Sequence, residues 1–110
     1  MKFYIDAGEF KLPIQIQEFI EMPNGDDIPT QNWTTFINIR AKVINTSGRE
    51  YTQGQGTGSA IYKKFYIRFP RQEVTSNHRI LHNNQIFNIT YVNNIDDQNK
   101  YLEIVAELKK

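Results

Sequence analysis

The feature that most constrains this chain is a two-residue alternation of apolar and polar side chains that recurs along most of its length. Successive side chains of a β-strand point to opposite faces, so this pattern is typical of strands with one buried face. The three- to four-residue spacing of an amphipathic helix is nearly absent. The sequence therefore predicts an all-β fold, with strands within residues 12–20, 37–43, 61–69, 79–81, 86–92 and 102–108.

The alternation also predicts which side chains of these strands face the core. In the first strand Gln15 and Gln17 should point away from the core, because they have the opposite parity to the isoleucines beside them. The apolar residues expected on the buried side are Leu12, Ile14, Ile16, Ile20, Ile37, Ile39, Ala41, Val43, Ile61, Phe65, Ile67, Phe69, Leu102, Ile104, Ala106 and Leu108.

The connections between the predicted strands differ in length and in chemistry. Residues 82–85 predict a tight hairpin, since Asn83 and Asn84 tolerate positive φ. Residues 22–29 predict a polar loop bounded by prolines, and residues 93–99 an acidic turn region. Residues 45–60 are different: this stretch of sixteen contains four of the six glycines, and structureless connections of that length are usually functional or disordered.

A chain of 110 residues is expected to form one domain, residues 1–110. About six short antiparallel strands are best satisfied by a small β-barrel or sandwich, and a closed barrel has fewest exposed strand edges. The sequence thus predicts a small antiparallel β-barrel with a long Gly-rich loop at 45–60, which is expected to be flexible. No apolar run is long enough for a membrane-spanning helix, so no membrane partner is expected.

Residues that could carry catalysis or hold a cofactor are weakly placed. The chain has no Cys, no identifiable Ser triad, and a Gly-rich stretch at 54–59 that lacks the Lys of a nucleotide-binding loop. His78 and His82 flank a short strand and are expected at the surface, while the Asp pairs at 26–27 and 96–97 are expected in solvated turns. We therefore expect no enzyme, no catalytic residue, no metal and no cofactor.

The near-zero formal charge of +1 does not indicate a dedicated duplex-DNA-binding protein. One nucleic-acid interpretation remains open as an alternative. Tyr62, Lys64, Tyr66 and Arg68 share one face of a predicted strand, as in the stacking platforms of barrels that bind single strands. The alternative function is therefore an OB-like barrel that binds single-stranded nucleic acid.

The order of features resembles the head closure, or head-tail joining, proteins of long-tailed bacteriophages. These are connector proteins of about this length with a small β-barrel. The order and spacing carry the resemblance, since no single segment is specific. The matching segments are residues 12–17, Trp33, residues 41–43, the Gly48-Arg49-Glu50-Tyr51 run, and residues 66–69, 79–81, 85–89 and 101–104.

The resemblance implies a structural virion protein at the head-tail interface, assembled in the host cytoplasm. It implies a homo-oligomeric ring, expected to be dodecameric, with adaptor and portal proteins on the head side and tail-terminus proteins on the tail side. The ring would act as a stopper that retains packaged double-stranded DNA in the channel and would provide the surface for tail attachment. The residues implied in closing the channel are Tyr51, Thr52, Gln53, Gly54, Gln55, Gly56, Thr57, Gly58 and Ser59, and those at the loop base, contacting a neighbouring subunit, are Gly48, Arg49 and Glu50.

The composition of this loop is compatible with such a role. Sixteen residues that double back reach about 25 Å at ~3.3 Å per residue, which is comparable to the bore that a duplex needs. Small, neutral side chains suit a plug that must seal without gripping phosphates. Relatives often continue after Gly-Arg-Glu with residues that can form a helix, whereas residues 52–59 are Gly-rich and favour a loop.

Overall fold

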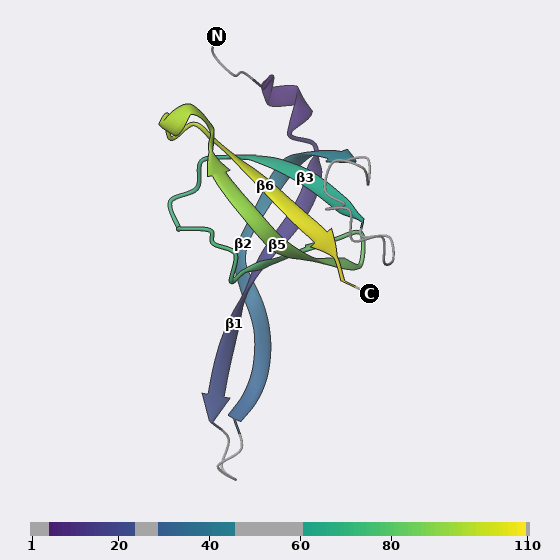
Figure 1. The fold of residues 1–110 in the computed structure, drawn as a ribbon, viewed down its shortest axis with the longest axis vertical. Helices are drawn as coiled ribbons and strands as arrows, with labels where there is room; N and C mark the ends of the chain where they lie inside the picture. The colour runs from purple at the N-terminus through teal and green to yellow at the C-terminus, as the bar shows by residue number, and fades with distance from the viewer. Residues whose placement is uncertain (1–4, 24–28, 46–60, 110) are drawn as a thin grey trace, which may run out of the picture.

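Six strands close into an antiparallel barrel in the computed structural model, which describes residues 5–23, 29–45 and 61–109. Around the barrel the order is β1-β2-β3-β6-β5-β4, and β4 pairs with β1 to close it (Figure 1). This architecture confirms the predicted all-β barrel of about six strands. The strands are β1 (Leu12–Pro23), β2 (Pro29–Asn45), β3 (Tyr62–Arg68), β4 (Arg79–His82), β5 (Gln85–Asn94) and β6 (Tyr101–Leu108).

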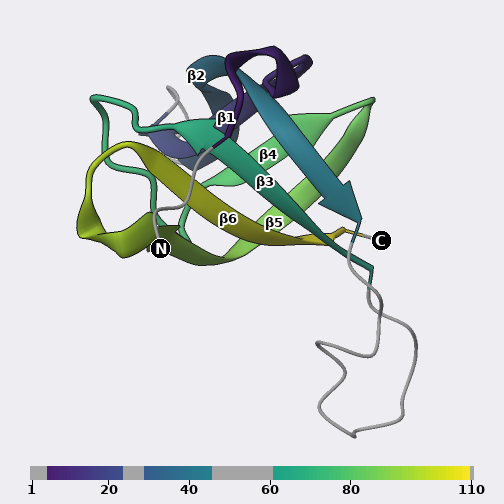
Figure 2. The same cartoon turned by 90° about the horizontal axis from the view of Figure 1, so that it is seen from above.

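Helical structure in the described residues is limited to two 3-10 turns, η1 (Ala7–Glu9) and η3 (Ile95–Asp97). Neither is a helix that could cross a membrane, and the described part of the chain contains no other helix. Seen from above in Figure 2, β3 and β6 lie side by side in the barrel wall, in agreement with their pairing from Tyr62 with Glu107 to Arg68 with Tyr101.

The barrel interior contains most of the apolar side chains that the alternation placed there, together with Val74, Ile80, Phe87 and Ile89, which were not predicted. Phe65 and Phe87 meet edge to face with ring centroids 5.4 Å apart, a favourable geometry for aromatic pairs. Both rings are fully buried, so they exclude water from the centre of the barrel. The buried residues of this core are Ile14, Ile16, Ile37, Ala41, Phe65, Ile67, Val74, Ile80, Phe87, Ile89, Leu102, Ile104 and Ala106.

Three residues expected on the buried side are exposed. Leu12, Ile61 and Phe69 retain 42%, 47% and 42% of their accessible surface. Each lies at or beyond the end of a strand, where the barrel wall stops and no neighbouring strand covers the side chain. The prediction of burial was wrong for these three residues because parity identifies the face of a strand but not where the strand leaves the core.

A β-bulge between Ile16 and Gln17 shifts the register of β1 against β2. The extra residue is Phe36 of β2, since Ile16 lies opposite Ile37 and Gln17 lies opposite Thr35. Gln17 shares the face of Gln15, as alternation predicts, because its Nε2 donates a hydrogen bond of 2.8 Å to Gln15 Oε1. It is nevertheless only 9% exposed, and Arg79 donates a hydrogen bond to its Oε1.

The first hairpin is much longer than predicted. Residues 22–29 were expected to form a loop, but β1 and β2 continue pairing as far as Pro23 opposite Pro29. We call residues 18–23 and 29–35 the ribbon. Figure 1 shows the ribbon leaving the barrel as a two-stranded projection. Proline is tolerated here because each proline lies at the end of its strand.

The turns largely follow their predicted chemistry. Asn83 and Asn84 have φ of 51° and 62° between β4 and β5, which confirms the tight Asn-Asn hairpin. Asp96 and Asp97 are exposed in η3, which confirms the solvated turn. His82 is only 4% exposed, so the expectation of a surface histidine was wrong for it; its Nδ1 lies 3.4 Å from the Pro13 carbonyl oxygen.

Candidate functional site

The residues predicted to close the channel and to form the loop base, residues 48–59, lie outside the described residues. The structure does place the points where this connection joins the barrel. Asn45 at the end of β2 pairs with Lys63, and Ile44 pairs with Lys64 in β3. The chain therefore leaves the barrel wall and returns to it on adjacent antiparallel strands.

Three lysines surround these two points, and we call Lys63, Lys64 and Lys109 the lysine rim. Lys109 is brought here because β6 ends beside the start of β3, with the Leu108 N–H donating to the Ile61 carbonyl at 2.8 Å. Across the described ranges the only ion pair is Lys42 with Glu9, so no lysine of the rim is neutralised by a described carboxylate. The rim is therefore a local source of positive charge.

Of the four side chains proposed for stacking single-stranded nucleic acid, Tyr66 is buried and Arg68 is exposed. Tyr66 is 7% exposed, because the N-terminal residues Ile5 and Phe10 pack against it. Its hydroxyl donates a hydrogen bond of 2.8 Å to Glu103. The guanidinium of Arg68 lies 4.9 Å from the Phe10 ring centroid. The prediction of an open Tyr66 face was wrong, since an N-terminal segment covers a side chain that the alternative function requires.

The root of the ribbon is held by a cluster that the sequence analysis missed. Arg79, the first residue of β4, donates from Nε to Oε1 of Gln17 at 2.7 Å. The same guanidinium lies 4.2 Å from the ring centroid of Trp33 on β2. Trp33 in turn meets Phe19 edge to face at 5.4 Å. Cation–π, aromatic and hydrogen-bond contacts therefore tie both strands of the ribbon to β4.

A second contact supports the ribbon root from the segment before β4. His78 stacks on Phe36 with centroids 4.4 Å apart, and its Nδ1 accepts a hydrogen bond of 3.0 Å from the Thr75 N–H. Beside these contacts is an open hollow of about 420 Å³. Its lining residues are Glu18, Phe19, Trp33, Asn77 and His78.

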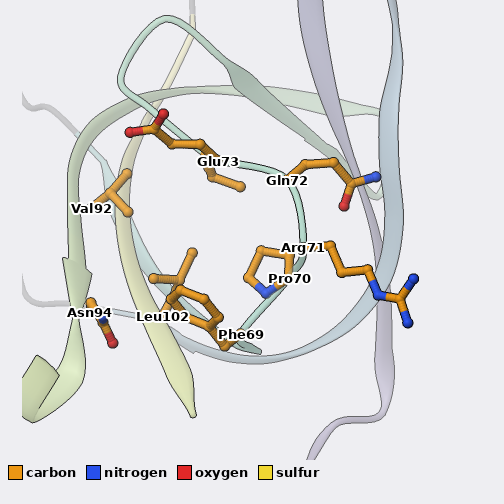
Figure 3. Close-up of a pocket in the computed structure, with 9 residues that line it drawn as sticks. Phe69, Pro70, Arg71, Gln72, Glu73, Val92, Asn94 and Leu102 are labelled. Carbon is orange, nitrogen blue, oxygen red and sulfur yellow. The ribbon is translucent and has the colours of Figure 1, made fainter. Parts of the chain in front are cut away.

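Another hollow, of about 390 Å³, lies where the chain leaves β3 (Figure 3). Phe69, Pro70, Val92 and Leu102 surround it, while the Arg71 side chain is directed away from it. Its lining combines these apolar side chains with the polar residues Gln72, Glu73 and Asn94. The part of the chain that the structure describes has no group of three or more metal-ligating side chains here or elsewhere.

The pKa values of two charged groups are shifted from their ordinary values. The hydrogen bond from Lys42 Nζ, 3.0 Å from Glu9 Oε1, lowers the pKa of Glu9, and the Asp6 N–H donates to the same carboxylate. Desolvation lowers the pKa of Arg79 below its ordinary value. The Glu9 contact joins the N-terminal segment to β2, so the cover over Tyr66 is partly electrostatic.

Strand-forming residues in the ribbon were a signal for its length. Thr30, Trp33, Thr34 and Thr35 favour strands, although the flanking Pro and Asn-Gly residues favour a turn. The contact between Arg79 and Trp33 could not be predicted from the sequence, because more than forty residues separate them. They meet because closure of the barrel pairs β4 with β1, the neighbour of β2.

The geometry therefore defines a small closed β-barrel with a projecting ribbon. A family model described as phage head completion protein matches residues 5–109. The chain belongs to this family, and membership gives it a structural role in the phage head. No curated protein matches the chain.

Two solved structures share the fold. One chain of the virion of a native gene transfer agent particle has a TM-score of 0.66 at 19% identity, and the match covers 88% of this chain and 92% of that one. A protein of Shigella flexneri 2a, solved in solution, has a TM-score of 0.69 at 17% identity, with 94% and 96% covered. At these identities the likeness concerns the fold alone.

Proposed function

We propose that the protein is the head-closure component of a phage head-tail connector. Copies would form a ring, expected to be dodecameric, below the portal and its adaptor. The ring would close the DNA exit channel after packaging and would present the docking surface for tail-terminus proteins. Membership of the phage head completion family supports a place in the phage head, and the finer role rests on the arrangement of the barrel's connections.

The observation that carries this proposal is the connection between β2 and β3. Asn45 and Lys63 are paired neighbours, so residues 46–60 must double back, and such a segment can reach about 25 Å from the barrel. The barrel is closed by the pairing of its six strands, and Tyr51 is the only large apolar residue of the connection, so the connection is not expected to fill the core. A segment that extends far from the barrel and does not contribute to its apolar core is suited to closing a channel.

The loop base has a separate role in this proposal. Arg49 and Glu50 are expected to contact a neighbouring subunit rather than to stabilise their own barrel, because an exposed ion pair within one chain contributes only about 0 to 1 kcal/mol. Arg49→Ala should therefore leave the melting temperature of the isolated protein unchanged and impair incorporation into heads. A large fall in melting temperature with normal incorporation would assign Arg49 to the barrel's own stability.

The alternative of single-strand binding is disfavoured by the burial of Tyr66. Titration of the protein with labelled single strands at low salt is a direct check. Saturable binding that is lost in Lys64→Ala would reinstate the alternative. We expect no such binding.

Deletion of residues 53–58 tests channel closure. The shortened protein should keep the β-sheet circular dichroism and melting temperature of the parent, because residues 53–58 are Gln, Gly and Thr and include no apolar side chain expected in the core. Heads carrying it should package DNA and then lose it before tail attachment. The measurement is the fraction of DNA-filled heads by electron microscopy at increasing times after packaging.

The matched control replaces the same six residues with six residues of Gly and Ser, which keeps the length of the loop. We expect this control to retain DNA, because length and small side chains are the properties the proposal requires. Equal DNA retention by the shortened protein and its parent would refute channel closure by this loop, and would leave it a role in docking alone.

A further inference from the structure

The edge of β1 loses its strand partner at the point where the ribbon leaves the barrel. β4 pairs with β1 only from Gln15 to Gln17, so the outer edge from Glu18 to Pro23 has no strand partner among the described residues. The ribbon carries this edge away from the barrel (Figure 1). An unpaired edge presents backbone N–H and C=O groups that pair readily with an extended segment of another chain.

The open hollow of about 420 Å³ beside Trp33, which we call the root hollow, lies along this edge. It is lined by Asn77 and His78, which precede β4, and by Glu18 and Phe19, which follow the last residue of β1 that β4 pairs. Consecutive side chains of a strand point to opposite faces, so a hollow lined by both Glu18 and Phe19 lies at the edge of β1 rather than on one face. An extended segment in the root hollow would therefore lie beside the unpaired edge.

The side chains of the root hollow suit a basic residue. Glu18 supplies a carboxylate that makes no ion pair or hydrogen bond with any other described residue. Phe19 is 40% exposed and meets the Trp33 ring edge to face, so aromatic surface lies next to this carboxylate. Lys and Arg side chains bury their apolar stems along such surface, and their charged ends are attracted both to a ring and to a carboxylate.

Arg79 does not occupy this place. Its Nε donates to Gln17 Oε1 at 2.7 Å, and its guanidinium lies 4.2 Å from the centroid of the Trp33 ring. It forms no ion pair with Glu18, since the ion pair found within the described ranges is that of Lys42 with Glu9. The same ring cluster therefore already binds one guanidinium, while Glu18 is left to a base from outside the barrel.

The ribbon is also held in its projecting position. An isolated two-stranded hairpin is marginally stable in water. Here Arg79 contacts Gln17 on β1 and Trp33 on β2, and His78 stacks on Phe36 of β2. The root hollow is therefore formed before a partner arrives, and a fixed surface loses less conformational entropy on binding than a mobile one.

The described part of a second copy offers no extended basic segment that could leave its own barrel. Its Lys and Arg residues lie in the paired strands or in the short connections next to them. The connection that contains Arg71 is held by a hydrogen bond of 2.9 Å from the Phe69 N–H to the Lys100 carbonyl and by the burial of Val74. The occupant that fits the root hollow is therefore a different chain.

We propose that an extended segment of an adjoining virion protein pairs with the unpaired edge of β1 and places a Lys or Arg side chain in the root hollow, against Glu18 and Phe19. The inference rests on the proposed connector role, in which a different protein adjoins the ring on each side, and it names the surface that one of them uses. Main-chain pairing supplies affinity, and Glu18 supplies selectivity for a basic side chain.

The first test identifies the occupant in assembled particles. Phe19 is replaced by p-benzoylphenylalanine, an aromatic residue that forms a covalent bond with a neighbouring chain on irradiation. Mass spectrometry should find the adduct on another virion protein, in a segment with a Lys or Arg beside the adduct. The matched control places the same residue at Phe69, which is 42% exposed and lies away from the ribbon. It should give no adduct with that segment.

The second test changes the charge of the root hollow. Glu18→Lys should lower recruitment of the crosslinked protein about tenfold, because a repulsive charge replaces an attractive one, and Glu18→Gln should lower it less. Changing the basic residue of the partner to Glu should restore recruitment by Glu18→Lys. The matched control, Glu73→Lys, changes an exposed carboxylate elsewhere and should leave recruitment unchanged. Circular dichroism and Trp33 emission check that each variant folds.

Electron microscopy of the parent particles separates this inference from the proposed function. A ring at the head-tail interface without an adduct at position 19, or with an adduct on a second copy, overturns the docking of an adjoining protein and leaves the ring intact. An adduct on a segment without a base, or normal recruitment by Glu18→Lys, also overturns the proposal. Absence of any ring overturns the proposed function itself.

Discussion

Replacing Arg79 by Ala should destabilise the protein by about 2 kcal/mol. The substitution removes a charge-assisted hydrogen bond of 2.7 Å to Gln17, worth about 1.5 to 3 kcal/mol, and a cation–π contact with Trp33, worth about 0.5 to 1 kcal/mol at an exposed site. Arg79 is partly exposed, so the lower ends of these ranges apply. Gln17 is 9% exposed and would keep its hydrogen bond to Gln15, which limits the penalty.

Thermal unfolding followed by circular dichroism measures this loss. With an unfolding entropy of about 2.1 cal/mol/K per residue, 1 kcal/mol corresponds to about 4 °C for a chain of this length, so the melting temperature should fall by about 9 °C. Trp33 is the only Trp, so its fluorescence reports on the ribbon root specifically. Its emission should shift in Arg79→Ala under native conditions, before any unfolding.

Arg79→Lys and Arg71→Ala are the controls for this prediction. Lys keeps the charge over the Trp33 ring and loses the Nε geometry, so it should recover part of the lost stability. Arg71 is exposed and its side chain points away from the nearby hollow, so its replacement should change the melting temperature little (Figure 3). If Arg79→Ala melts within about 2 °C of the parent and leaves Trp33 emission unchanged, Arg79 does not secure the ribbon.

Three further predictions concern the barrel. The hydrogen bond from Lys42 lowers the pKa of Glu9, so the Lys42–Glu9 pair stabilises the folded state at pH values above the unfolded pKa of Glu9. This stabilisation is lost as pH falls through the folded pKa of Glu9. Glu9→Gln should therefore remove the small decrease in stability that the parent shows below pH ~4 in acid titrations. Phe87→Ala should cost about 3 to 5 kcal/mol in denaturant unfolding, because its fully buried ring leaves a cavity, and a cost below 1 kcal/mol would contradict its central place. At Asn84, where φ is 62°, Ala should lower stability by about 1 kcal/mol while Gly should not; equal melting temperatures would contradict the hairpin geometry.

Alternation was sufficient to predict the barrel because burial of one strand face is a local, periodic property. Ile67 and Ile104 are buried where their parity placed them. The same parity relates His82 to Ile80, and following it would have predicted the burial of His82. Its polar character favoured the surface instead, although a buried imidazole is tolerated when a carbonyl such as that of Pro13 lies close.

The features that sequence could not predict depend on contacts between distant strands. The bulge at Phe36, opposite Ile16 and Gln17, belongs to the register between β1 and β2, and no local signal encodes that register. Arg79 and Trp33 meet because β4 pairs with β1, the neighbour of β2. Pro29 was interpreted as a limit of the loop, and β2 begins at this residue rather than near Ile37, where the predicted strand starts. The candidate loop at 48–59 remains a prediction, since it lies outside the described residues.

Closure of the barrel separates folding from assembly in this protein. The six strands complete one another around a core whose largest side chains, including Phe65 and Phe87, are fully buried, so the body has no apolar core face that requires a partner. Strand edges without a strand partner are concentrated in the ribbon. Substitutions of exposed ribbon residues should therefore change incorporation into heads while leaving the unfolding transition in place. Core substitutions should change both incorporation and the unfolding transition, because an unfolded barrel cannot present these edges.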